Sequence, residues 1–280
     1  MNILKAHGLL ILVFIAGAVA SDSLTSTPDV KMLFHANGQV TLGAQIYGKP
    51  RFEDLGPGYR SDIAVNTELF GYKDLIFDFL TAASTSIARL PETPVKLDKI
   101  RYTLTPELRY ELRKSLITGS LFHECIHTLS RAEDTAGSTW WNVVQVGMGT
   151  KGAYSFYFIR RYDNRDFALR NSFDASINAG YYLHGHAALI GHNHEYAFDL
   201  SGLIRYHFGL FRNQTFFIDL THHTWLDKNN KYTFKLTGEI DYVILAFDNI
   251  ATLFYSHCFI DENPYDNENS LGTIGFKIIF

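Results

Sequence analysis

The chain has 280 residues, of which 46% are hydrophobic and 19% are charged, and its formal net charge is −4 at pH 7. This balance excludes an intrinsically disordered chain, the presence of only two cysteines excludes a disulfide scaffold, and the lack of repeated long apolar runs excludes a bundle of membrane helices. The slightly acidic charge argues against nucleic acid as a partner. Aromatic residues are in excess, at 15% of the chain with 22 Phe and 16 Tyr.

Residues 1–20 have the pattern of a secretory signal peptide, because Lys5 and His7 precede an apolar stretch that ends in Ala-Val-Ala. We expect cleavage before Ser21. An uncleaved membrane anchor is the alternative, although the apolar stretch is short for a hydrocarbon core of about 30 Å. The mature chain is therefore expected to work outside the cytoplasm, where free thiols tend to oxidise.

Alternation of apolar and polar residues dominates the rest of the chain. In Arg101–Leu112 the even positions are apolar, with tyrosines near both ends, and the odd positions are polar. Lys231–Tyr242 repeats this pattern, with four charges on its polar face. A soluble β-sandwich also alternates. The length of these strands and the aromatics at the ends of their apolar faces favour membrane strands, which must close into a barrel because lipid cannot satisfy open backbone groups.

The last strand of the chain points the same way. Leu271–Phe280 carries Ile274, Phe276, Ile278 and Phe280 on one face, and the chain stops at that final aromatic. Combined with the signal-peptide pattern, this resembles the terminal strand of bacterial outer-membrane β-barrels. The resemblance implies an all-β, transmembrane, antiparallel up-and-down barrel in the bacterial outer membrane. It also implies contact with membrane lipids and with the outer-membrane assembly machinery.

The resulting division is a signal peptide at 1–20, an N-terminal periplasmic segment at 21–37 and a barrel at 38–280. Fourteen strands are expected, at 38–48, 60–71, 73–85, 99–111, 114–127, 139–149, 152–162, 170–182, 185–191, 196–209, 214–225, 231–242, 248–259 and 271–280. If 185–191 and one neighbour belong to a loop, the count is twelve. Even counts are typical of bacterial barrels, and they leave both termini in the periplasm.

The loops and the lumen follow from this segmentation. Longer polar connections at 49–59, 86–98, 128–138, 163–169 and 260–270 are expected on the outer side. Charged residues on the inward faces predict a crowded lumen of mixed charge, built from Asp78, Arg109, Glu111, Asp199, Arg205, Lys235 and Glu239.

The segment with the clearest chemistry is the end of the fifth strand. There the period-two pattern puts His123, Cys125 and His127 on one outward face, and Asn142 lies outward on the next strand. Adjacent strands are about 4.8 Å apart, so a register that sets Asn142 opposite His123 or Cys125 brings nucleophile, base and base-orienting amide within reach. A flanking histidine can activate a cysteine.

This arrangement resembles outer-membrane phospholipase A, which has a His, one residue, then Ser, with an Asn following Trp on the next strand. Lipid A deacylase, a smaller barrel, is similar in its His-x-Ser pair. His123-Glu-Cys125 and Trp141-Asn142 match the pattern, with Cys125 in place of Ser and a longer intervening loop. The resemblance implies hydrolysis of a lipid acyl ester, with calcium as the cofactor that would help to form the oxyanion site. His127 has no role in the family's pattern.

Other interpretations stay open at this stage. The histidines and Cys125 can be interfacial residues of a barrel without chemistry: a narrow, porin-like pore, an adhesin-like surface protein or a structural barrel. Four further histidines have spacings that suit zinc or copper, but solvated turn residues are the favoured interpretation: His184, His186, His192 and His194. Cys125 and Cys258 are far apart in strand order, so two free thiols are expected.

Overall fold

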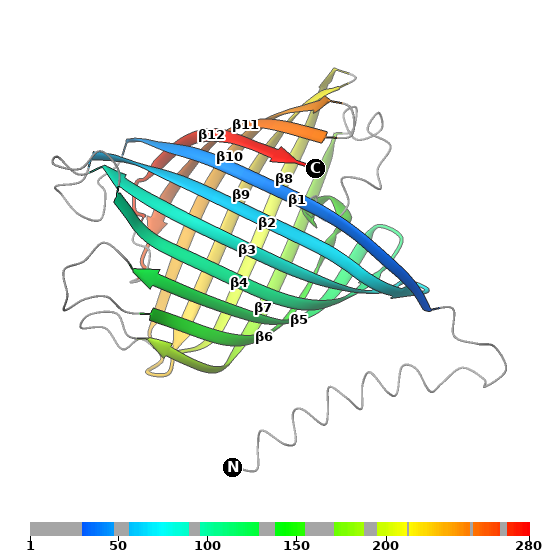
Figure 1. Cartoon of the computed structure of the whole chain (residues 1–280), viewed down its shortest axis with the longest axis horizontal. Coiled ribbons are helices and arrows are strands. Elements are labelled where there is room, and N and C mark those ends of the chain that lie inside the picture. Colours follow the sequence, from blue (N-terminus) through cyan, green and yellow to red (C-terminus); the bar gives the residue numbers. More distant parts are fainter. Residues whose placement is uncertain are drawn as a thin grey trace, which may run out of the picture.

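The computed structural model describes residues 30–47, 56–89, 96–128, 138–154, 171–187, 195–211, 213–246, 249–263 and 268–280. These residues form a closed antiparallel barrel of twelve strands, in which each strand pairs with its neighbours in chain order and β1 pairs with β12 (Figure 1). The strands are β1 (Val30–Tyr47), β2 (Gly56–Tyr72), β3 (Leu75–Arg89), β4 (Lys96–Glu111), β5 (Ser115–Thr128), β6 (Ser138–Thr150), β7 (Ser172–Ala187), β8 (Tyr196–Phe211), β9 (Gln214–Asp227), β10 (Tyr232–Ala246), β11 (Asn249–Asp261) and β12 (Gly272–Ile279).

Of the two strand counts considered from the sequence, twelve is confirmed. The expected strand at 152–162 begins instead as the 3₁₀ turn η1 (Lys151–Tyr154), and its remaining residues lie outside the described ones. The expected strand at 185–191 overlaps the end of β7, which runs to Ala187, and residues 188–191 lie outside the described ones. Period two predicted separate strands at both places, because it marks alternating runs and not which segments pair. Strand β1 begins at Val30, earlier than the expected 38.

The two ends of the barrel differ in their connections. At the short-turn end, β2–β3, β4–β5, β8–β9 and β10–β11 are joined by 73–74, 112–114, 212–213 and 247–248. The long-loop end carries 48–55, 90–95, 129–137, 188–195, 228–231 and 262–271. The connection 151–171 joins the ends of β6 and β7 that lie at the short-turn end, and the expected outer loop at 163–169 lies outside the described residues.

The barrel closes at the final aromatic residue. The amide of Gly38 donates to the carbonyl of Phe280 at 2.8 Å, and the amide of Phe280 donates to the carbonyl of Gly38 at 2.9 Å. A Cβ atom on Gly38 would lie 2.4 Å from the Phe280 ring, so glycine leaves the space into which this ring packs.

The inward faces carry the mixed charges predicted from the sequence. Arg109 has no exposed surface and binds the carboxylates of Glu68 and Asp78. Further round the barrel Lys277 bridges Glu239 and Asp241. Other lumenal pairs join Arg205 to Asp219 and Lys235 to Asp261. Each buried cation therefore has carboxylate partners, which is the condition under which charge is tolerated away from water.

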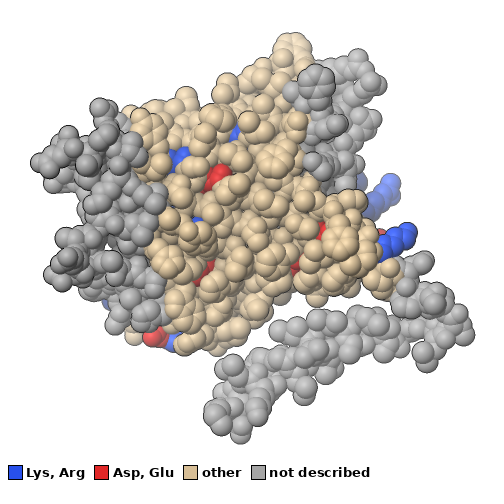
Figure 2. Space-filling model, viewed as in Figure 1, with Lys and Arg blue, Asp and Glu red and all other residues tan. Residues whose placement is uncertain are grey.

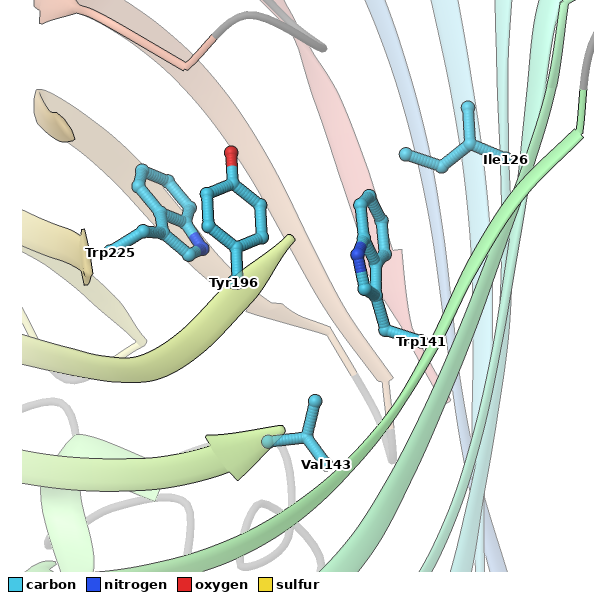
Figure 3. Packing of buried hydrophobic residues seen from close by; sticks show 5 residues of the cluster. All are labelled: Ile126, Trp141, Val143, Tyr196 and Trp225. Carbon is cyan, nitrogen blue, oxygen red and sulfur yellow. The ribbon is translucent and has the colours of Figure 1, made fainter. Parts of the chain in front are cut away.

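Near the long-loop end, the interior holds an aromatic cluster in place of charges. Figure 3 shows Trp141, Tyr196 and Trp225 pointing toward one another, with Val143 and Ile126 beside them. The ring centroids of Trp141 and Tyr196 are 5.9 Å apart, and those of Tyr196 and Trp225 are 6.0 Å apart. This packing ties β5 and β6 to β8 and β9 from inside the barrel.

The outward faces are apolar, and few charged side chains interrupt them in the view of Figure 2. On β12, Ile274, Phe276 and Ile278 alternate outward as expected, each at least 40% exposed. An isolated soluble protein rarely leaves so many large apolar side chains in water. Among the described residues, no helix is both long enough and apolar enough to cross a membrane.

Candidate functional site

The candidate site lies on the outward wall where β5 approaches the long-loop end. His123, Cys125 and His127 are half-buried there, whereas the residues that alternate with them point inward, as the 2% exposure of Ile126 shows. Leu121 on β5 and Val146 on β6 are 45% and 58% exposed on the same wall, further toward the short-turn end. The polar residues therefore mark the point where the apolar wall gives way to the rim.

His123 and Asn142 form a hydrogen-bonded pair across two strands. Of the registers considered from the sequence, the observed one sets Asn142 directly opposite His123. The Nδ1 atom of His123 lies 2.8 Å from Oδ1 of Asn142. Because an amide oxygen can only accept, Nδ1 carries a proton and donates it to this bond. In the neutral form of a histidine held in this way, Nε2 has the lone pair and can act as a base.

The thiol of Cys125 makes its hydrogen bond to the other histidine. Its Sγ atom lies 3.1 Å from Nε2 of His127, two residues along the same face. The sequence pattern pointed to His123 as the base and kept His127 as a further catalytic candidate, although the family's pattern gives His127 no role. In the structure Cys125 lies between the two imidazoles, and the one in contact with sulfur is His127. The catalytic roles of these residues stay a prediction.

Aromatic side chains frame the three residues on both sides. In the strand registers, Cys125 lies between Tyr102 on β4 and Trp140 on β6. The Tyr102 ring packs edge-on to His127 with centroids 6.1 Å apart, and the Trp140 ring lies 6.4 Å from that of His123. Amphipathic rings of this kind collect at the level of lipid headgroups.

The inner face holds this wall in place. Glu124, between His123 and Cys125, points inward, and its carboxylate forms an ion pair with Arg101 of β4 at 3.0 Å. On β6, Trp141 and Val143 lie on either side of Asn142 and belong to the interior aromatic cluster. The backbones that carry the outward polar groups are therefore anchored from inside, as a preorganised site requires.

One further residue, His184, belongs to this outward site, although the sequence pattern favoured it only as a solvated turn residue. His184 lies directly opposite Asn142 on β7, and its ring is 5.1 Å from that of Trp140. The pairing of β6 with β7 skips Leu183, and this bulge turns His184 outward. Strict alternation cannot show such a shift. His184 and His186 are residues of strand β7 rather than of a turn, and His192 and His194 lie outside the described residues.

The β4–β5 ladder is interrupted next to the site. Leu104 pairs with His123, and pairing resumes only at Glu107 and Ser120. Pro106 lies within this gap and has no amide hydrogen to give to the ladder. The strand below His123 is therefore less tightly tied to β4 than to β6, where the pairing continues from Ser115 to His127.

The described residues of the site do not fit calcium, the ion that the phospholipase resemblance implies. Calcium takes six to eight oxygen ligands. The outward groups around Cys125 are imidazoles, a thiol and aromatic rings, and the Asn142 oxygen is bound to His123. The described residues of the site therefore do not supply the oxygen ligands that calcium needs.

A second cluster with ligand-like spacing lies in the lumen. Asp219, Glu239 and Asp241 bring carboxylate oxygens within 4.8 Å of one another. Arg205 binds the first of these residues, and Lys277 binds the other two. All three carboxylates therefore already have an ion-pair partner, so the cluster is part of the lumenal charge network.

No family model and no curated protein matches this sequence. Solved structures do. The outer-membrane phospholipase A of Escherichia coli is 9% identical, with a TM-score of 0.50 over 89% of this chain and 94% of that one. The Salmonella typhi phospholipase dimer with bound calcium is 8% identical, with a TM-score of 0.50 over 92% and 94%. An outer-membrane channel from Pseudomonas putida F1 is 8% identical, with a TM-score of 0.55 over 92% and 99%.

The fold is that of an outer-membrane β-barrel. In this class the short turns face the periplasm and the longer loops face outward. The long-loop end is therefore the outer end, and the outer-membrane localisation predicted from the sequence agrees with the fold. His123, Cys125 and Asn142 then lie on the lipid-facing wall near the outer leaflet.

Proposed function

We propose that this outer-membrane barrel is a lipid acyl hydrolase of the outer leaflet, with Cys125 as the nucleophile and with His123, oriented by Asn142, as a base. The observation that carries the proposal is the 2.8 Å hydrogen bond between His123 and Asn142 on the lipid-facing wall, two residues from the thiol. An imidazole oriented by an amide, beside a nucleophile, is the general signature of covalent catalysis.

The position of the pair also favours a lipid substrate. Polar side chains on the membrane face of a barrel lose their hydration and do not gain the ion pairs that lumenal residues have. Such a position is therefore unfavourable for stability, and contact with a lipid substrate gives a reason for it. Tyr102 and Trp140 flank Cys125, and amphipathic rings of this kind collect at the headgroup level, near the acyl esters of a lipid. The local resemblance to outer-membrane phospholipase A, noted from His123, Cys125 and Asn142, supports the same class of substrate.

Acyl release by the folded protein tests the proposal. Protein refolded in detergent or vesicles is expected to release fatty acid from phospholipid or lipid A, and Cys125→Ala and His123→Ala are expected to abolish release while the heat-modifiable barrel persists. Cys258→Ala is the matched control, because that cysteine is 4% exposed and lies on an inward face. No release by wild type, with or without calcium, overturns the proposal.

A barrel without chemistry is the second candidate, and the structural similarity to an outer-membrane channel favours it. A narrow pore predicts conductance in planar bilayers that changes in Arg109 or Glu239 variants and not in Cys125→Ala. Because Arg109 is fully buried against carboxylates, the route for ions would have to pass this network.

A further inference from the structure

Cys125 is flanked on one face of β5 by two histidines that differ in what they bind. His127 contacts the sulfur through Nε2 at 3.1 Å. His123 is bound through Nδ1 to Asn142 at 2.8 Å, and the hydrogen bond of the thiol does not go to it. A single-base arrangement needs one of these histidines and leaves the other unexplained.

We propose that the two histidines divide the reaction: His127 takes the proton of the Cys125 thiol during acylation, and His123, held by Asn142, activates water during deacylation. The division rests on the proposed hydrolase function. It assigns a catalytic role to His127, which the phospholipase pattern does not use.

In the first half-reaction the Sγ–H bond of Cys125 breaks and its proton passes to Nε2 of His127. The sulfur attacks the ester carbonyl of the lipid and forms a C–S bond. The C–O bond to the glycerol or sugar breaks, and the leaving alkoxide takes the proton back from the His127 imidazolium. The products are an acyl thioester on Cys125, a free lipid hydroxyl and a neutral His127, so atoms and charge balance.

In the second half-reaction water must attack the thioester. Because Asn142 fixes the proton of His123 on Nδ1, the lone pair of Nε2 is available to take a proton from water. The hydroxide forms the carboxylic acid as the C–S bond breaks, and the proton returns from His123 to the departing thiolate. Both histidines and Cys125 are then in their starting states.

Each of the two imidazoles has its own aromatic neighbour. The Tyr102 ring packs edge-on to His127, and the Trp140 ring packs beside His123. The two rings stand on different strands on either side of Cys125. Each histidine therefore has its own neighbour that limits its rotation, which favours two fixed roles over one shared role.

Thiol alkylation tests the first assignment without any lipid substrate. In a Cys258→Ser background, folded protein is treated with iodoacetamide at neutral pH. His127→Gln is expected to slow alkylation of Cys125 by about tenfold or more, because the thiol loses its proton acceptor. His123→Gln is expected to leave the rate within about twofold of the parent. Equal slowing in both variants, or none in His127→Gln, overturns the assignment. If His127→Gln does not show the heat-modifiable gel mobility of a folded barrel, His127→Asn replaces it.

Trapping of the intermediate tests the second assignment. With an activated nitrophenyl ester of a fatty acid, His123→Gln is expected to accumulate an acyl adduct on Cys125, visible as an added mass on the intact protein. The ester turnover of His123→Gln is expected to fall about 10²–10⁴-fold, the usual range for loss of a general base. His127→Gln is expected to show no adduct. An adduct in His127→Gln but not in His123→Gln overturns the division. If wild type hydrolyses no lipid, the proposed function fails, while alkylation still decides which histidine serves the thiol.

Discussion

Arg109 of β4 and His123 of β5 lie on neighbouring strands but on opposite faces of the barrel wall. Arg109 is fully buried and its guanidinium binds Glu68 and Asp78. His123 is half-buried on the lipid side, where its partner is the neutral amide of Asn142. Both faces thus contain polar groups joined by hydrogen bonds, but the inner groups are ion-paired and fully buried, whereas the outer imidazole–amide pair is half-buried on the lipid side.

This difference separates structure from activity. Removing one member of a buried ion network leaves an uncompensated charge, so the inner face is expected to control stability. The outer groups are half-buried and their hydrogen bonds do not join opposite charges, so their loss is expected to cost less stability. The outer residues are hydrogen-bonded in register beside a thiol, and their loss is expected to cost little stability. We therefore expect them to control function. Four predictions test this contrast.

The largest effect is expected at the inner network. Arg109→Met leaves Glu68 and Asp78 buried without their cation and should lower the free energy of unfolding by about 3–5 kcal/mol. Urea unfolding in vesicles, followed by tryptophan fluorescence, measures this. The control is Arg60→Met, because the Arg60–Asp62 pair is 50% and 25% exposed and should contribute less than about 1 kcal/mol. Equal losses would contradict the distinction between enclosed and exposed pairs.

Adjacent tryptophans offer the sharpest comparison between faces. Trp141 is 6% exposed within the aromatic cluster, so Trp141→Ala should cost about 3–5 kcal/mol. Trp140 lies on the outward wall, so Trp140→Ala should cost less than about 1 kcal/mol. Brominated lipids provide an independent reading: they should quench Trp140 and spare Trp141. The reverse quenching would show that β6 is assigned to the wrong faces.

A smaller effect is expected where the barrel closes. Gly38→Ala places a Cβ 2.4 Å from the Phe280 ring, and displacing that ring should cost about 1–3 kcal/mol. Gly119→Ala is the control, since a Cβ there would meet nothing within 4 Å. Refolding yield and the urea midpoint measure both variants. Similar behaviour of the two would mean that the terminal ring does not depend on the space at Gly38.

The smallest effect is expected in the outer pair itself. In a double-mutant cycle, His123→Ala and Asn142→Ala should show a coupling of about 1 kcal/mol in the free energy of unfolding, the usual net value of one hydrogen bond. Both single variants should nevertheless lose acyl release. A coupling near zero would mean that the two side chains are not paired in the membrane.

Alternation along the chain predicted the barrel, because each strand has one face to lipid and one to the lumen. The outward placement of Phe280 and the inward charges such as Arg109 and Asp78 followed from the same period. The strand count did not, since alternation gave separate strands at 152–162 and 185–191, where the structure has η1 at the start of the first run and the end of β7 at the start of the second. The bulge at Leu183, which turns His184 outward, breaks the period and was invisible to it.

The candidate site was predictable in part. The sequence placed His123, Cys125 and His127 on one face and Asn142 on the facing strand. Which residue contacts which depends on register, and register depends on loop length and on contacts formed by the whole barrel. The register thus decided the pairing of Asn142 with His123. The 3.1 Å contact between Cys125 and His127 lies within β5 and depends on side-chain orientation, which the pattern does not give.

By itself the sequence determined the fold class, the inward and outward faces of most strands and the segment that carries the candidate chemistry. The physical reason is that period two and the requirement to satisfy every backbone group in lipid leave few alternatives. Only the tertiary structure decided the number of strands, the pairing of His123 with Asn142 and the contact of the thiol with His127. The first two depend on how neighbouring strands pair, and the third depends on the side-chain orientations within β5; no single residue encodes either.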